Sequence, residues 1–186
     1  GTAHWPRLAW AVRATPARSP IWPPARRNTD AVNVAQLKAT QTHYYSVQSA
    51  GAGTPNYNND GAQAAGSMAA GAGAEVSAKG NNSTAVGLSS KVIDAENSVA
   101  MGYRNTVTGN GLNSYDNSVA IGNQNTVSNS GNSIAIGNKN TLDTAALSGL
   151  IGSANSIESG SGGYIFGAGN QVKNSVAAAI SGNSST

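Results

Sequence analysis

One phrase recurs along this chain with small changes, as NSVAIGNQNTV at residues 117–127 and NSIAIGNKNTL at residues 132–142. Aligning the chain on the glycine of each AIG-like phrase gives intervals of 16, 15, 20, 15, 15 and 15 residues between Gly71, Gly87, Gly102, Gly122, Gly137, Gly152 and Gly167. A nearly constant interval of this size indicates a solenoid, in which each repeat is one coil stacked on the last. Since the phrase holds no acid, histidine or cysteine, its recurrence describes architecture rather than a catalytic site.

Large and small apolar residues alternate within the phrase, as in Val119, Ala120 and Ile121. Alternation with a period of two is typical of a strand that turns one face inward. Each coil is therefore expected to hold two short strands, of the types SVAIG and NTV, joined by turns. Because a coil of roughly 15 residues is too short for three long faces, we predict an all-β fold, a flattened parallel β-roll with like residues stacked roughly 4.8 Å apart.

Two apolar columns run along the predicted roll, one immediately before each glycine and one five residues after it. Together with the first large residue of the phrase, these columns are expected to face inward. The predicted core residues are Val99, Met101, Val107, Val119, Ile121, Val127, Ile134, Ile136, Leu142, Ile151, Ile157, Phe166 and Val172. The small residue between the two large ones, for example Ala120, is then expected to face outward.

Turn residues recur at fixed places as well. The phrase ends at Gly102, Gly122 and Gly137, and an asparagine follows three residues later at Asn105, Asn125 and Asn140. We expect these asparagines at the point where the chain reverses, because asparagine tolerates the left-handed region and its side chain can bond nearby backbone. Stacked asparagines can also bond to one another as ladders.

A candidate interface follows from apolar residues without an obvious partner. In the last coils the small middle residue becomes large, and an outward position there would expose an apolar strip that needs a partner, for which a second copy of the chain is the hypothesis. Residues 29–48 also predict a short helix, capped near Asp30, whose narrow apolar seam cannot bury itself alone. The candidate residues for an interface between copies of the chain are Val34, Leu37, Leu150, Ile165 and Ile180.

Composition divides the chain into four segments. Residues 1–28 form an arm that holds all three tryptophans, five of the six prolines and five arginines without an acid. We expect this arm to be disordered; it is either a basic, aromatic contact for a membrane surface or polyanion, or sequence foreign to the native protein. Residues 29–48 are a neck-like connector, residues 49–65 a loop rich in turn residues, and residues 66–186 the roll.

The 20-residue interval contains a five-residue insertion within residues 108–117. In a solenoid, an insertion bulges from one edge without disturbing the stack. Leu112 and Tyr115 on this bulge are candidate ligand contacts, with an ordinary surface loop as the alternative.

Charge and composition argue against several classes of function. From residue 29 onward six cations stand against eight acids, a net charge of −2, so the chain lacks the basic stripe that nucleic acid requires. Cysteine is absent, and no glycine-rich stretch continues into the GK[ST] of a phosphate loop. The histidines are His4 and His43, and the acids are single apart from Asp94 and Glu96. These residues support neither a triad nor a carboxylate pair, so we predict no enzyme, metal or cofactor site.

The phrases NSVAIG, NSIAIG and NSVAMG, with the NTV that follows, resemble the head repeats of trimeric autotransporter adhesins, the YadA-like head, over residues 66 to about 182. DAVNVAQLKA at residues 30–39 resembles the neck motif of the same family. The resemblance implies a left-handed β-roll that forms a homotrimer on the surface of a Gram-negative bacterium. The family's stalk and outer-membrane anchor are expected to lie outside this sequence.

Two hypotheses of function remain. The first is an adhesin head, a rigid trimer that attaches a bacterium to a host extracellular-matrix protein or cell-surface receptor through many weak contacts. The second is a solenoid enzyme acting on carbohydrate, or a module that binds glycan or ice. An ice binder needs a flat row of threonines, and the column Thr106, Thr126 and Thr141 gives way to Ser156 and Gln171.

Overall fold

The computed structural model describes residues 34–40, 46–48, 51, 53–110 and 116–183. The chain divides into two units, residues 1–46 and 47–186. In the first unit the described structure is one helix, α1 (Val34–Ala39), which carries no buried residue. The predicted arm at residues 1–28 and the predicted loop contacts Leu112 and Tyr115 lie outside the described residues.

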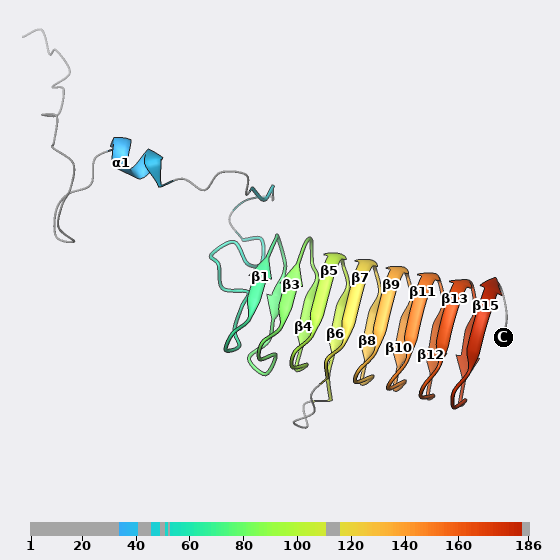
Figure 1. Ribbon diagram of the computed structural model, residues 1–186. Coiled ribbons are helices and arrows are strands. Elements are labelled where there is room, and N and C mark those ends of the chain that lie inside the picture. Colours follow the sequence, from blue (N-terminus) through green and yellow to red (C-terminus); the bar gives the residue numbers. More distant parts are fainter. Residues whose placement is uncertain (1–33, 41–45, 49–50, 52, 111–115, 184–186) are drawn as a thin grey trace, which may run out of the picture. The chain divides into compact units, whose positions relative to one another are not determined.

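The second unit is a parallel β-solenoid whose successive strands alternate between two sheets (Figure 1). The eight-stranded sheet contains β1 (Met68–Ala70), β3 (Thr84–Val86), β5 (Val99–Tyr103), β7 (Val119–Asn123), β9 (Ile134–Asn138), β11 (Gly149–Ser153), β13 (Tyr164–Ala168) and β15 (Ala179–Asn183). The seven-stranded sheet contains β2 (Glu75–Val76), β4 (Lys91–Ile93), β6 (Thr106–Thr108), β8 (Thr126–Ser128), β10 (Thr141–Asp143), β12 (Ser156–Glu158) and β14 (Gln171–Lys173). The predicted roll of two-stranded coils is confirmed.

The register of the strands follows the repeat. Val107 pairs with Val127, and Val127 with Leu142, so each residue lies beside its equivalent in the next coil. The long interval does not break this order, because β5 pairs with β7 and β6 with β8 across the insertion. As expected for a solenoid, the extra residues leave the stack intact.

The core lies between the two sheets and has one large and one mostly small column. The seven-stranded sheet contributes the predicted column five residues after each glycine, and Val107, Val127, Leu142, Ile157 and Val172 are all buried. The eight-stranded sheet contributes the middle residue of the phrase, which is fully buried at Ala85, Ala100, Ala120, Ala135, Leu150 and Ile165. Five of the thirteen predicted core residues, those of the column after the glycine, are therefore buried as expected.

The prediction is wrong for the other eight core residues, because the strands of the eight-stranded sheet face the opposite way. The residues that flank the middle position lie on the outside, half-buried or exposed: Val99, Met101, Val119, Ile121, Ile134, Ile136, Ile151 and Phe166. A large-small-large pattern has a period of two whichever face of the strand points inward. The space between the sheets determines whether the large or the small residues face the core. The seven-stranded sheet already fills most of that space with valine, leucine and isoleucine, so alanine fits opposite them.

A neighbouring residue shrinks in one coil where a larger residue enters the small column. Leu150 and Ile165 replace alanine in the last coils, and glycine replaces serine at Gly163. A Cβ atom on Gly163 would lie 2.9 Å from Cδ1 of Ile157. The glycine thus leaves room for the larger core of these coils, which explains the departure of GGYIFG from the repeated phrase.

The asparagine column forms the predicted ladder, but inside the roll. Asn125 is buried, and its Nδ2 donates to Oδ1 of Asn105 at 2.9 Å and to the carbonyls of Ile121 and Gly137 at 2.9 and 2.8 Å. The backbone N–H of Asn140 in turn donates to Oδ1 of Asn125 at 3.0 Å. Within the described part of the chain, no buried side-chain nitrogen or oxygen lacks a partner.

The left-handed residue of this turn is the one before the asparagine, which corrects the prediction. Arg104, Gln124 and Lys139 have φ values of 51°, 54° and 55°. The glycines of the phrase adopt an even less common conformation, with φ of 123° at Gly137. A Cβ atom at Gly137 would collide with the carbonyl oxygen of Gly152 in the next coil. Glycine is therefore required there by backbone conformation and by the close approach of the next coil.

Candidate interaction surface

The outside of the eight-stranded sheet is apolar along most of its length. Two columns of outward side chains make up this surface, which we call the apolar strip: Val86, Val99, Met101, Val119, Ile121, Ile134, Ile136, Ile151, Tyr164 and Phe166. Tyr164 and Phe166 are 52% and 51% exposed, Ile134 is 44% exposed and Ile151 is 43% exposed. Contiguous exposure of this kind is uncommon on monomeric proteins and marks an interaction surface.

Parallel register makes the strip continuous. Ile121 pairs with Ile136, Ile136 with Ile151, and Ile151 with Phe166, so one outward position repeats over successive coils. In the second column Gly149 interrupts the large residues, and a Cβ atom there would lie 2.9 Å from Cδ1 of Tyr164. The tyrosine ring thus lies beside the glycine and covers the interruption.

The outside of the seven-stranded sheet is polar. Its outward positions include Thr106, Thr126 and Thr141, which stack in register. At each end of this sheet an ion pair joins neighbouring strands, Lys91 to Glu75 with nitrogen and oxygen 2.7 Å apart and Lys173 to Glu158 at 3.1 Å. The two faces of the roll therefore differ sharply in polarity, and the continuous apolar surface of the described residues lies on the eight-stranded sheet.

Of the five predicted interface residues, only some are exposed enough to contact a partner. Val34 and Leu37 on α1 are 66% and 64% exposed. Leu150 and Ile165 are fully buried and cannot contact a partner, while Ile180 is half-buried and packs against the core. The prediction of an outward strip at those two positions is wrong for the reason already given, the reversed orientation of the strands. Sequence reasoning assigned the residues of the true strip to the core.

One signal in the sequence could have identified the strip. A buried serine precedes the middle alanine by two residues, as Ser118 does Ala120, so the two small residues share one face of the strand. The serine hydroxyl Oγ donates across the roll to the carbonyl of Ser130 at 2.9 Å. A face carrying only small residues is the one that can approach the opposite sheet closely.

Asp116 has the most unusual chemistry among the described side chains. It lies beside the insertion and is 6% exposed, and its Oδ2 accepts a bond from the backbone N–H of Glu96 at 3.2 Å. Burial raises the pKa of the Asp116 carboxyl, and the neighbouring Glu96 carboxylate raises it further, against the lowering effect of that bond. A buried acid beside a second acid favours the protonated form.

Neither a metal centre nor a membrane-spanning helix is found within the described ranges. No three acidic, histidine or cysteine side chains gather there in a way that could hold a metal ion. No helix in the part of the chain that the structure describes is long and apolar enough to cross a membrane. His4 and His43 lie outside the described residues.

Comparison with known families identifies the repeated coil. Residues 94–111 and 116–140 match the family model of the YadA head domain repeat, in two copies. The matched segments cover the two coils on either side of the insertion and include the phrases that carry the resemblance. No curated protein and no solved structure matches the chain.

Proposed function

Because the solenoid is a head domain of the trimeric autotransporter adhesin type, we propose that three copies of this chain pack through their apolar strips to form an adhesive head. Heads of this family form homotrimers in general and are generally not enzymes. The observation that carries the proposal is the apolar strip, which runs along the eight-stranded sheet from Val86 to Phe166.

The direction of the strip suits a three-fold assembly. The strip follows the stacking direction of the coils, so three chains can surround one axis parallel to their solenoids and each can bury its whole strip. Rotation by a third of a turn closes such a ring and leaves no strip exposed. An assembly that does not close would leave the apolar strip of its last chain exposed to solvent. Full burial of an exposed large side chain contributes roughly 1.5–3 kcal/mol. Since the side chains of the strip are already partly buried in one chain, each contributes part of that amount, repeated over successive coils and three chains.

Further features complete the proposal. The roll is left-handed, and α1 with exposed Val34 and Leu37 belongs to a neck in which three helices cover these side chains. In the full-length protein the head is held at the bacterial surface by an outer-membrane anchor. The polar face then points outward and binds host extracellular-matrix proteins or cell-surface receptors, which gives the head a role in attachment and virulence.

The mass of the chain in solution tests the assembly. Light scattering on a sizing column is expected to give about 56 kDa, three times the 18.6 kDa of one chain. Ile136→Asp places a charge in the middle of the strip and is expected to shift the mass to that of the monomer. Thr126→Asp, on the outside of the other sheet, is the matched control and should leave the trimer unchanged.

The same variants separate assembly from adhesion. Trimeric wild type is expected to bind at least one of a panel of immobilised matrix proteins at least about tenfold more tightly than monomeric Ile136→Asp, through multivalency alone. A monomeric wild-type chain at micromolar concentration would remove the basis of the proposal. Equal dissociation by Ile136→Asp and Thr126→Asp would show that the strip is not the interface.

A further inference from the structure

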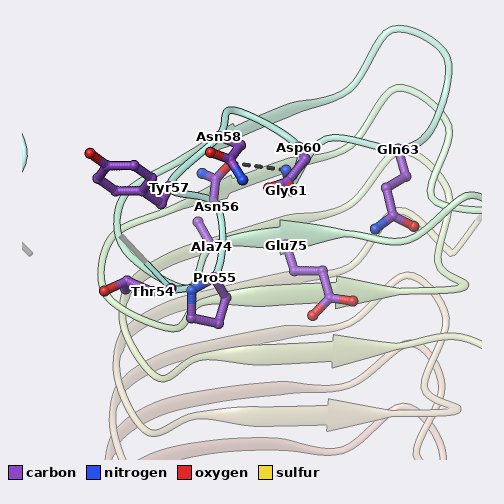
Figure 2. A pocket seen from close by; sticks show the side chains of 11 residues that line it. Thr54, Pro55, Asn56, Tyr57, Asn58, Asp60, Gly61, Gln63, Ala74 and Glu75 are labelled. Atoms are coloured by element: carbon purple, nitrogen blue, oxygen red, sulfur yellow. Dashed lines mark hydrogen bonds between the residues drawn. The ribbon is translucent and has the colours of Figure 1, made fainter. Parts of the chain in front are cut away.

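A hollow of about 480 Å³ lies where the chain enters the solenoid, between the loop of residues 53–63 and β2. Figure 2 shows Tyr57 at one rim of this hollow and Gln63 and Glu75 at the opposite rim. Its volume falls in the range of pockets that hold small ligands. The repeat does not account for these residues, because the loop precedes the first coil.

Hydrogen bonds from the Asn56 side chain and from the backbone hold the loop in place against the first coil. Asn56 has a φ of 64°, its Nδ2 donates to the carbonyl of Gly71 at 3.1 Å, and its Oδ1 accepts from the backbone N–H of Gly61 at 2.9 Å. The carbonyl of Pro55 accepts from the N–H of Gly73 at 2.7 Å. Ala62 also forms a parallel bridge with Val76 of β2. The hollow therefore has a fixed shape before any ligand arrives, which lowers the entropy cost of binding.

Four of the polar side chains around the hollow are not used by the fold. Tyr57, Asn58, Asp60 and Gln63 are exposed, and their side chains form no hydrogen bond or ion pair with any residue that the structure describes. Elsewhere in the roll, amides such as that of Asn125 are fully bonded. The hollow thus combines an aromatic ring with free donors and acceptors, including both a carboxylate and an amide.

The charge of the hollow limits its ligand. Glu75 is paired with Lys91 at 2.7 Å, whereas the Asp60 carboxylate forms no ion pair with any residue that the structure describes. An anionic ligand would be repelled, while a carboxylate and an amide can each bond neighbouring hydroxyls of a polyol. An aromatic ring at the rim can contact the apolar C–H face that sugars present.

We propose that this hollow binds an uncharged saccharide, whose hydroxyls bond Asp60, Gln63 and Glu75 and whose ring contacts Tyr57. The hollow is built by one chain and lies at the end of the polar seven-stranded sheet, so the site does not require the apolar strip. The proposal is therefore independent of the trimer. A chain that stays monomeric can still bind sugar, and a trimer that binds no sugar leaves the assembly proposal standing.

Saturation-transfer NMR on the full 186-residue chain tests the site with glucose, galactose, mannose, N-acetylglucosamine and lactose as probes. At least one of these sugars is expected to receive magnetisation, and 3′-sialyllactose is expected to bind more weakly than lactose. Tyr57→Ala and Asp60→Asn should each weaken the binding at least about tenfold, the loss of one good contact. Tyr57→Phe should retain most of it, because the ring remains.

The matched control is Asp143→Asn, which removes an exposed carboxylate from β10 on the same sheet. It should bind the sugars as wild type does, and unchanged thermal unfolding of all variants would show that the fold is intact. Three results would overturn the proposal: no transfer to any of the five sugars, equal binding by Tyr57→Ala and wild type, or preference for the sialylated sugar.

Discussion

The eight-stranded sheet places Ile136 and Phe166 on its outside, whereas the seven-stranded sheet places Thr126 and Thr141 there. On the inside the two sheets serve one core, with small residues from the first opposite larger residues from the second. The sheets therefore share a structural task and differ in surface chemistry. This separation is possible because successive residues of a strand point to opposite faces.

Because the strands stack in parallel register, the residue type at one position of the repeat is repeated along a whole face of the roll. An apolar residue before the glycine of one coil is a single exposed side chain, but in register over six coils, from Val86 to Phe166, it becomes a surface. The polar sheet is amplified in the same way, as the threonines of β6, β8 and β10 show. The repeat length thus sets the fold, and the outward positions decide what each face contacts.

The largest expected effect comes from the glycine that only the eight-stranded sheet contains. Gly137→Ala is expected to destabilise the chain by more than about 4 kcal/mol, because it combines a φ of 123° with a collision against the next coil. Gly131→Ala is the control, since the nearest atom to its new Cβ would be 3.8 Å away. Thermal unfolding followed by circular dichroism should place the control within about 0.5 kcal/mol of wild type.

A smaller effect is expected from the inward side of the seven-stranded sheet. Leu142→Ala removes a fully buried side chain and should cost about 3 kcal/mol, the transfer of the lost atoms plus the cavity they leave. Thr141→Ala changes the adjacent outward residue and should cost less than about 1 kcal/mol. Similar midpoints for these two variants in urea denaturation would contradict the assigned orientation of β10.

The periodicity of the sequence predicted the coils, the two strands in each and the buried column that contains Leu142. It could not fix the orientation of the other strands, because Val119, Ala120 and Ile121 alternate equally well with either face inward. That choice depends on the width of the roll, a property of both sheets together. The asparagine ladder was predicted from its fixed column, while the left-handed conformation belongs to the preceding residue, Gln124.

The hollow at the entrance could not be predicted from any pattern. The sequence predicts only a loop at residues 49–65, and the placement of Tyr57 and Glu75 around one hollow depends on bonds between that loop and the first coil. Such contacts have no period and leave no repeated signature. The charge of the wall likewise depends on Lys91, which lies in the next strand of the sheet and neutralises Glu75.

The turns that join the two sheets give the smallest predicted effect. Asp116 lies in the connection between β6 and β7, and its pKa is raised above the ordinary 3.8 by burial and by Glu96. The native chain therefore binds this proton at a higher pH than the unfolded chain does. The sign of the linkage follows: the contribution of Asp116 to stability falls as the pH rises from about 4 through the native pKa, and at pH 7 the buried charge carries its full cost.

Asp116→Asn removes that charge while keeping an oxygen that can accept from the N–H of Glu96. The thermal midpoint at pH 7 is expected to rise by on the order of 2 °C, and the gain should shrink as the pH is lowered toward 4. Asp143→Asn, on the exposed outside of β10, controls for the loss of one negative charge. If Asp116→Asn instead lowers the midpoint at pH 7, the bond from Glu96 outweighs the cost of burial, and the charged carboxylate is part of what joins the two sheets at this turn.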